Sequence, residues 1–566
     1  MISFWEILSG NLRGSLTLVR GKARIRIVEQ WRDLKAPGIP DFTPLKRVCC
    51  KTESEDDVAE DRIREIKIEK IGKLRDAGHH PYPERWERSH TLAEASGLEE
   101  GATGVRICGR IVSRRDFGKL TFFDLQDLHG RMQCSVQKDD LGADSFKEFN
   151  KLVDIGDFVG VEGEVYKTRI GQLTVRASQW TFLGKMLRPM PEKFHAISDR
   201  EIRYRRRYLD LISDEESRNR FRLRRDFIRA LRDGLDEAAF DEVETPVLQT
   251  KPSGALATPF ETHHAALDIP VYMRIAPETY LKRCIVAGFD RVYEFARVFR
   301  NEGMDPSHLQ DFTMLEYYAA YWNYIDNMDF TENLLRSAIE KCTGSLVVPH
   351  TAGDIDFGGE WPRKSMTDLV QEHAGINLSE CPDADSLRAA IAGRGISLDD
   401  VDHLGRGALI DQLYKKTVRP HLKQPTFVVQ HPVDLSPLAR SNDDDPTITD
   451  RFQLVIHGWE VINAYSELVD PIDQRGRLEE QAKLHADGDD EAMVMEEDYL
   501  MAMEHGMPPI SGWGMGIDRM VALLCGAENL RDVVLFPLLK PEEGNAVEEA
   551  LFNEGEEAPA IEGADA

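Results

Sequence analysis

Residues 291–321 read RVYEFARVFRNEGMDPSHLQDFTMLEYYAAY, and this stretch decides the fold. Two runs of β-branched and aromatic residues flank a polar loop with glycine and proline, which is the pattern of two strands paired as an antiparallel hairpin. Because side chains alternate between the two faces of a strand, Phe312, Glu316 and Tyr318 share one face. We therefore predict an antiparallel sheet that carries polar groups on one surface.

The other strand of this hairpin adds charge to the predicted surface. Glu294 and Arg300 share a face by the same alternation. An arginine, an aromatic ring and carboxylates on one sheet surface indicate a binding site, whereas an exposed sheet face with scattered charges is the alternative.

A third strand-like run, EVINAYSELVD at 460–470, repeats the pattern. It places Asn463, Tyr465 and Glu467 on one face. Glu460 and Asn463 have opposite parity, so both reach one pocket only if a bulge intervenes.

A glycine-rich turn, SGWGMGIDRMVALL at 511–524, precedes an apolar helical run. Glycines such as Gly516 let the backbone approach a ligand closely, and Arg519 at the helix start supplies a planar donor for phosphate or purine. No GxxxxGK[ST] phosphate loop occurs in the sequence, so a nucleotide would be bound in another way.

Residues 104–184 contain five short strand-like runs separated by turns, which predict a small barrel of the oligonucleotide-binding type. Before them, residues 60–78 have apolar positions at helical spacing and end in a glycine. The predicted class is α+β: a five-stranded barrel followed by a larger domain built on an antiparallel sheet flanked by helices. We divide the chain into an extension of unknown role (1–55), a helix and barrel (56–190), a larger domain (191–540), for which the resemblance described below implies a catalytic role, and an acidic tail (541–566).

Composition limits the function. The 566 residues carry a formal net charge of −28, so a nucleic acid would have to be met by a local basic face. No run approaches the roughly 18 apolar residues of a membrane span, and the eight cysteines are dispersed. A reducing, cytoplasmic setting without membrane association is expected.

Taken together, these motifs resemble those of a known protein family. The chain resembles the lysyl-tRNA synthetases of class II, through seven stretches that occur in the same order: FETHHAALD, YMRIAPETYLKR, GFDRVYEFARVFRNEG, FTMLEYYAAY, NAYSELVDP, GDDEAM and GWGMGIDRMVALL. The resemblance implies a homodimer that uses ATP and Mg²⁺ to activate L-lysine and transfers it to tRNA(Lys).

The resemblance also implies roles for single residues. Catalytic roles fall to Arg300 and Arg519. ATP binding falls to Arg300, Glu302, His308, Phe312, Glu460, Gly516 and Arg519. Lysine binding falls to Gly254, Glu278, Glu316, Tyr318, Asn463, Tyr465 and Glu467. The metal falls to Glu460 and Gln453, and anticodon binding falls to Arg110, Phe123 and Gln133.

The lysine pocket also has a physical rationale. An ammonium has three donors and no acceptor, so its burial is tolerable only beside carboxylates and hydroxyls. Such a pocket rejects an uncharged side chain, because its carboxylates would stay unpaired.

The sequence departs from the family pattern at two informative positions. Gln453 stands where the family usually has a glutamate, so one metal contact loses its charge. Gln172 likewise replaces a common glutamate in the barrel. The alternatives are a ligase for another substrate, or a divergent nucleic-acid-binding protein without catalysis.

Overall fold

The computed structural model divides the chain into two compact units, residues 1–194 and 195–566. It describes residues 17–20, 23–28, 49–53, 55–189, 197, 199–252, 254–255, 257–398, 401, 404–486 and 495–541. The GDDEAM stretch, almost all of the predicted acidic tail and most of the predicted extension therefore lie outside the described residues. Among the described helices none is long and apolar enough to cross a membrane.

The first unit contains a closed five-stranded barrel with strand order β4-β5-β6-β8-β7. Buried residues alternate with more exposed ones along most of β4, as the sequence pattern requires, whereas β6 is buried over five consecutive residues. The elements are β1 (Thr17–Arg20), β2 (Ala23–Val28), β3 (Cys49–Glu53), α2 (Glu55–Asp76), α3 (Leu92–Ser96), β4 (Val105–Phe117), β5 (Leu120–Gln126), β6 (Arg131–Gln137), α4 (Lys138–Leu141), α5 (Ala143–Leu152), β7 (Phe158–Lys167) and β8 (Leu173–Gly184).

The second unit begins with helices and continues into the main sheet. Its first elements are α6 (Arg200–Arg205), α7 (Arg207–Ser213), α8 (Glu215–Glu237), β9 (Asp241–Glu242), β10 (Leu248–Gln249), β11 (Glu261–His264), β12 (Ile269–Met273), α9 (Glu278–Val286), β13 (Arg291–Phe299), β14 (Asp311–Ala320) and α10 (Tyr324–Thr343).

The remaining elements of the second unit include a group of helices between β17 and β18. They are β15 (Val347–Val348), β16 (Ile355–Asp356), β17 (Arg363–Ser365), α11 (Met366–Ala374), η1 (Leu378–Glu380), α12 (Ala384–Gly393), α13 (Arg406–Thr417), η2 (Arg419–His421), β18 (Thr426–Val429), η3 (Val433–Leu435), β19 (Arg451–Ile456), β20 (Trp459–Ser466), α14 (Pro471–Ala486), α15 (Glu497–Glu504), β21 (Ile510–Gly516), α16 (Ile517–Leu524) and η4 (Leu530–Val533).

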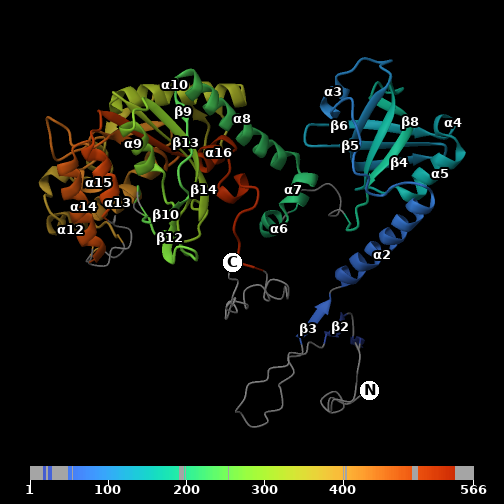
Figure 1. Ribbon diagram of the computed structural model, residues 1–566, viewed down its shortest axis with the longest axis horizontal. Coiled ribbons are helices and arrows are strands. Elements are labelled where there is room, and N and C mark those ends of the chain that lie inside the picture. Colours follow the sequence, from blue (N-terminus) through green and yellow to red (C-terminus); the bar gives the residue numbers. More distant parts are fainter. Residues whose placement is uncertain are drawn as a thin grey trace, which may run out of the picture. The chain divides into compact units, whose positions relative to one another are not determined.

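The main sheet has eight strands in the order β17-β18-β19-β20-β21-β14-β13-β9, and all its pairs are antiparallel except the two at its edges. The predicted hairpin is confirmed, because β13 and β14 pair antiparallel with Glu294 opposite Glu316. One face packs with α8 and α10 in a core that includes Leu315 and Tyr317 (Figure 1). The other face is left for the polar side chains of β14, and this arrangement confirms the predicted fold class.

Candidate active site

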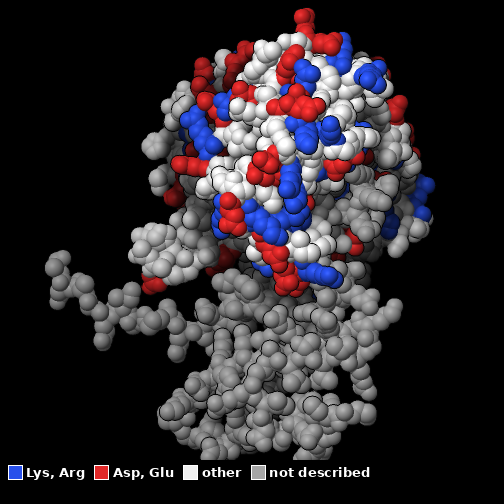
Figure 2. Space-filling model, turned by 90° about the vertical axis from the view of Figure 1, so that its right-hand side faces the viewer, with Lys and Arg blue, Asp and Glu red and all other residues white. Residues whose placement is uncertain are grey.

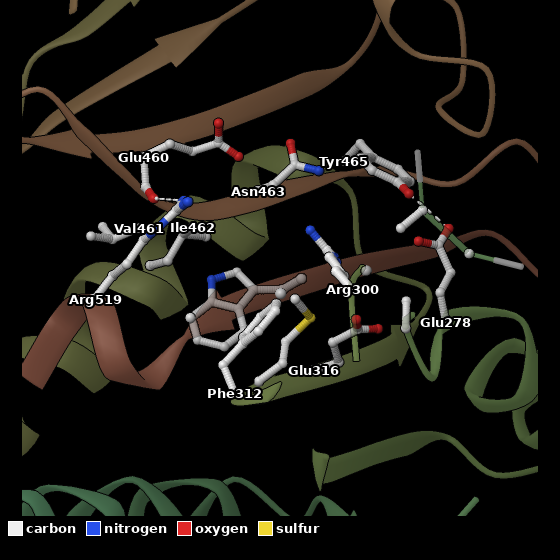
Figure 3. Close-up of a pocket in the computed structure, with 18 of the residues that line it drawn as sticks. Glu278, Arg300, Phe312, Glu316, Glu460, Val461, Ile462, Asn463, Tyr465 and Arg519 are labelled. Carbon is white, nitrogen blue, oxygen red and sulfur yellow. Dashed lines mark hydrogen bonds between the residues drawn. The ribbon is translucent and has the colours of Figure 1, made fainter. Parts of the chain in front are cut away.

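The polar face of the sheet opens into a cavity of about 300 Å³ lined by β14, β20, β21, the start of α9 and the loop after β13. Figure 3 shows the labelled side chains pointing into it from these separate elements. Most of the residues that the sequence assigned to ATP and lysine line this cavity: Gly254, Glu278, Arg300, Glu302, His308, Phe312, Glu316, Tyr318, Glu460, Asn463, Tyr465, Gly516 and Arg519.

Glycines of β21 form one wall of the cavity. Gly512 and Gly514 pair with Tyr318 and Glu316 of β14, so they share the face that those side chains occupy. A Cβ on Gly512 would collide with the Glu467 carboxylate and with the ring of Tyr318. Glycine is therefore required at this position for close packing, because the space is already filled.

Two partly buried arginines line the same cavity. The guanidinium of Arg300 lies 5.3 Å from the centre of the Phe312 ring, and Arg519 donates through Nη1 to the Glu460 carbonyl at 2.9 Å. Burial lowers the pKa of both guanidinium groups, although arginine stays charged in proteins. Two fixed cations that face one cavity suit a polyphosphate.

The loop after β13 adds a histidine. His308 Nδ1 lies 2.6 Å from Asp305 Oδ2, and its Nε2 lies 3.4 Å from Arg519 Nη2. Hydrogen bonds from Ser307 and His308 outweigh partial burial and lower the pKa of Asp305 to about 2. Asp305 therefore stays ionised and orients the imidazole toward the cavity.

Carboxylates gather at the closed end of the cavity. Glu278 and Glu316 line it, and both are less than 10% exposed. Glu278 begins α9, where the helix dipole favours a negative charge, and Tyr465 donates its hydroxyl to Glu278 Oε1 at 2.7 Å. Burial, reinforced by the nearby Glu278, raises the pKa of Glu316 well above its ordinary value.

Glu467 lies behind this lining. It is 1% exposed and does not line the cavity, but its Oε1 adjoins Gly512, which does. Apart from the ion pair with Lys282 and an interaction with the backbone of Gly512, its carboxylate oxygens accept no hydrogen bond from the described residues. A buried carboxylate with unused acceptors is expected to receive a donor.

Gly254 stays close to the carboxylates because of its backbone. Its φ of +86° lies in the left-handed region, and a Cβ there would come within 3.0 Å of the Glu278 Cβ. Both conditions favour glycine.

The predicted bulge is present in β20. Leu454 pairs with Ile462, but its neighbour Val455 pairs with Glu460, so Val461 is the extra residue. This shift brings Glu460 to the same cavity as Asn463 despite their opposite parity.

Gln453, the doubtful metal residue, is buried and does not line the cavity. It pairs across the sheet with Asn463, and its Oε1 has no hydrogen-bond partner among the described residues. The described part of the chain holds no group of three or more His, Cys, Asp or Glu residues at metal-binding distance.

The barrel corrects part of the anticodon prediction. Phe123 is 0% exposed and packs on Phe149 at 5.1 Å between ring centres, so the prediction that it stacks on a base is wrong. Adjacent residues of a strand face opposite sides, so Phe123 points into the barrel core and its neighbour Phe122 points outward. Phe122 pairs across the strands with the exposed Arg115.

The other two predicted anticodon residues are engaged within the barrel. Arg110 donates to the Gly156 carbonyl at 2.9 Å and covers the Phe158 ring at 4.3 Å. Gln133 is 6% exposed and accepts from Thr174 at 2.8 Å. These contacts leave a smaller polar surface than the sequence suggested.

Sequence reasoning missed two residues of the site. Lys282 lies between Glu278 and Glu467, and Arg451 lines the cavity and donates to Asn463 Oδ1 at 2.8 Å. The spacing of Glu278 and Lys282, four residues apart as on one face of a helix, is a signal that could have identified the first.

The fold and the cavity define a class of protein: an enzyme that binds a nucleotide and a cationic ligand on an antiparallel sheet and carries a separate oligonucleotide-binding barrel. Residues 199–540 match the family described as tRNA synthetases class II (D, K and N), and residues 105–183 match the OB-fold nucleic acid binding domain. The chain belongs to the class II tRNA synthetases of the D, K and N group.

Individual relatives agree with this assignment. The Lysine--tRNA ligase of Pelotomaculum thermopropionicum is 46% identical over 485 residues, which are 85% of this chain and 95% of that protein. The Lysine--tRNA ligase of a Synechococcus strain is 45% identical, over 85% of this chain and 97% of its own length. That of Bacillus cytotoxicus is 43% identical, over 84% and 96%.

Proposed function

We propose that this chain is a lysine–tRNA ligase that activates L-lysine with ATP and transfers it to the 3′ end of tRNA(Lys). The observation that carries the substrate is the closed end of the cavity, where buried carboxylates and tyrosine hydroxyls meet. A substrate ammonium satisfies these acceptors, whereas the carboxylate of aspartate would be repelled. A binding protein without catalysis has no support from the relatives, all three of which are ligases.

The first step joins the lysine carboxylate to the α-phosphate of ATP, and diphosphate leaves. Negative charge develops on the phosphate in the transition state, and the fixed guanidinium of Arg300 stabilises it. Arg519 acts on the nucleotide from the other side, and Phe312 offers a ring face to adenine. The chain supplies no nucleophile, so positioning of the two substrates provides most of the rate.

In the second step a hydroxyl of the terminal ribose of tRNA attacks the carbonyl of the adenylate, and AMP leaves. Glu278, Glu316 and Tyr318 hold the lysine, with Gly254 closing over it, while Asn463, Tyr465 and Glu467 complete the pocket. This division of roles places the reacting carboxylate next to Arg300 and the side-chain ammonium at the closed end.

Mg²⁺ fits the residues present. Glu460 offers a carboxylate in the cavity, whereas the Oε1 of Gln453 is a buried oxygen beside β20 that does not line the cavity. Both are hard oxygen donors of the kind that Mg²⁺ prefers. When bound, the ion would neutralise phosphate charge.

The barrel would recognise the anticodon of tRNA through an exposed strip. Phe122 and Phe117 meet edge to face at 6.2 Å, and Arg115 lies beside them on β4. An aromatic ring and a guanidinium suit unstacked bases. Figure 2 shows basic and acidic side chains interspersed on this side of the molecule, so binding would depend on a local site.

The enzyme would act as a homodimer in the cytoplasm. Large apolar side chains are exposed on the second unit's first helices, on the segment after α8 and on the segment after η4, where they would be covered by a second copy. They are Ile202, Tyr208, Val247, Leu248, Leu535, Phe536 and Leu538. Light scattering at micromolar concentration tests this, and a monomeric mass would contradict it.

Aminoacylation of a tRNA(Lys) transcript tests the function as a whole. Purified protein with ATP and Mg²⁺ should attach labelled lysine to the transcript and should attach neither aspartate nor asparagine. Charging with aspartate or asparagine in place of lysine would overturn the proposed substrate, and no charging with any of the three would overturn the proposed reaction.

A further inference from the structure

Lys282 is a fully buried lysine that touches two carboxylates at the closed end of the cavity. Its Nζ lies 2.6 Å from Glu278 Oε1 and 2.5 Å from Glu467 Oε2. Its side chain is 0% exposed. No role described above for the activation of lysine uses this ammonium.

We infer that Lys282 is a specificity-determining positioning residue that sets the charge of the pocket. Its ammonium cancels one of the two negative charges of Glu278 and Glu467, so the pair presents a single negative charge to a single substrate ammonium. This inference rests on the proposed function, because it assigns the partner of the lysine side chain.

Lys282 contacts both carboxylates away from the cavity. It follows Glu278 by one turn of α9, and neither Lys282 nor Glu467 lines the cavity, whereas Glu278 does. The cavity therefore meets Glu278 directly, and Glu467 and Lys282 lie behind this lining. Substrate and resident lysine need not compete for one position.

The surroundings keep Lys282 charged and in place. Burial alone would lower the pKa of its ammonium, but Glu278 and Glu467 raise it well above its ordinary value. Three tyrosine rings surround the ammonium, with their centres 5.7 to 5.9 Å away, which adds cation–π attraction. These rings belong to Tyr318, Tyr465 and Tyr499.

Loss of Lys282 would change the protonation of the pair. Burial already raises the pKa of Glu467, and the Lys282 ammonium opposes that rise. Without the ammonium the pKa of Glu467 would rise further, because burial and the neighbouring Glu278 both favour its protonated form. Lysine would then bind only as that proton leaves, so its binding would weaken as the pH falls.

The test is ATP–pyrophosphate exchange with lysine by Lys282→Met, a neutral replacement of similar length. We expect KM for lysine to rise at least about tenfold at pH 7, with KM for ATP nearly unchanged. We also expect the decrease of kcat/KM for lysine at low pH, the acidic limb of its pH profile, to begin at a higher pH than in the wild type. The matched control is Lys185→Met, which removes a buried, doubly paired lysine of the barrel and should leave both KM values unchanged.

A second comparison avoids the main threat to the fold of Lys282→Met, because the double variant leaves one buried carboxylate rather than two without a cation. In Glu467→Gln the pair should be neutral and bind lysine weakly, whereas the added Lys282→Met restores one negative charge. We expect the double variant to bind lysine more tightly than Glu467→Gln, as measured by equilibrium dialysis.

Three results would overturn the inference. They are an unchanged KM for lysine in folded Lys282→Met, a raised KM with an unmoved acidic limb, or a double variant that binds no better than Glu467→Gln. Wild-type protein that gives no exchange with lysine would instead contradict the proposed function.

Discussion

Two fully buried lysines, one in each unit, lie between pairs of carboxylates, and their surroundings differ. In the barrel, Lys185 pairs with Asp154 at 2.6 Å and Asp157 at 2.7 Å, and it also donates to the Leu152 carbonyl at 2.8 Å. Both oxygens of Asp157 accept further backbone hydrogen bonds. The buried atoms of Lys185 and Asp157 therefore all have partners, and this network stabilises the barrel.

In the catalytic unit, Lys282 pairs with Glu278 and Glu467, but the network is open. Beyond the Lys282 ammonium and the Gly512 backbone, the Glu467 oxygens accept no hydrogen bond from the described residues, and Glu278 lines a cavity. Native proteins rarely leave buried acceptors unused. The proposed lysine site uses this difference: the same residue types stabilise the barrel where their bonds are complete and leave an acceptor for a ligand where they are not.

The largest effect should follow from the removal of an arginine that lines the cavity of the catalytic unit. Arg300→Ala should reduce kcat/KM in ATP–pyrophosphate exchange at least about a thousandfold, because it removes fixed charge from the transition state. Arg297→Ala is the matched control, because Arg297 lies in β13 three residues before Arg300 and its side chain is on the opposite face of the sheet. It should stay within about twofold of wild type, and equal losses in both variants would contradict the assigned site.

The next largest effect should come from a substitution of Gly512, which forms part of the wall of this cavity. Gly512→Ala adds a methyl group where Glu467 and Tyr318 already lie, so KM for lysine should rise about ten- to a hundredfold. Gly476→Ala on α14, whose Cβ would meet nothing within 4 Å, is the control in the same exchange assay. A normal KM for lysine in Gly512→Ala would show that the carboxylate end is not where lysine binds.

The barrel offers a comparison between an inner and an outer ring. Phe122→Ala should raise KM for tRNA about tenfold, since stacking on a base is worth ~1–3 kcal/mol, and should leave ATP–pyrophosphate exchange unchanged. Phe123→Ala should instead destabilise the barrel by about 3–5 kcal/mol, as measured by urea unfolding. The opposite assignment of the two effects would restore Phe123 as the base contact.

The smallest effect concerns stability and pH. Burial raises the pKa of Glu316 above its ordinary value of 4.5, so the folded protein binds this proton more tightly than the unfolded chain, and the group destabilises the fold as pH rises past 4.5. Glu316→Gln should therefore raise Tm of the catalytic unit by about 2–4 °C at pH 8 and by nothing at pH 4. An unchanged Tm at pH 8 would show that Glu316 is ionised at little cost.

Much of this could be predicted from the sequence, because strand alternation is a local property. It placed Phe312, Glu316 and Tyr318 on one face, and it required the bulge that the structure has at Val461. The same reasoning gave the wrong residue in the barrel. Phe122 and Phe123 are adjacent, so their side chains face opposite sides of the strand, and only the packed core shows that Phe123 is the buried one. Lys282 was missed because its importance comes from Glu467, which is distant in sequence.

The most direct test of the central claim is ATP–pyrophosphate exchange by the wild-type protein with each of the twenty amino acids. The account predicts exchange that depends on lysine alone and is lost in Glu467→Ala. Exchange with another amino acid, or undiminished exchange with lysine in Glu467→Ala, would contradict the claim that the open carboxylate network selects lysine.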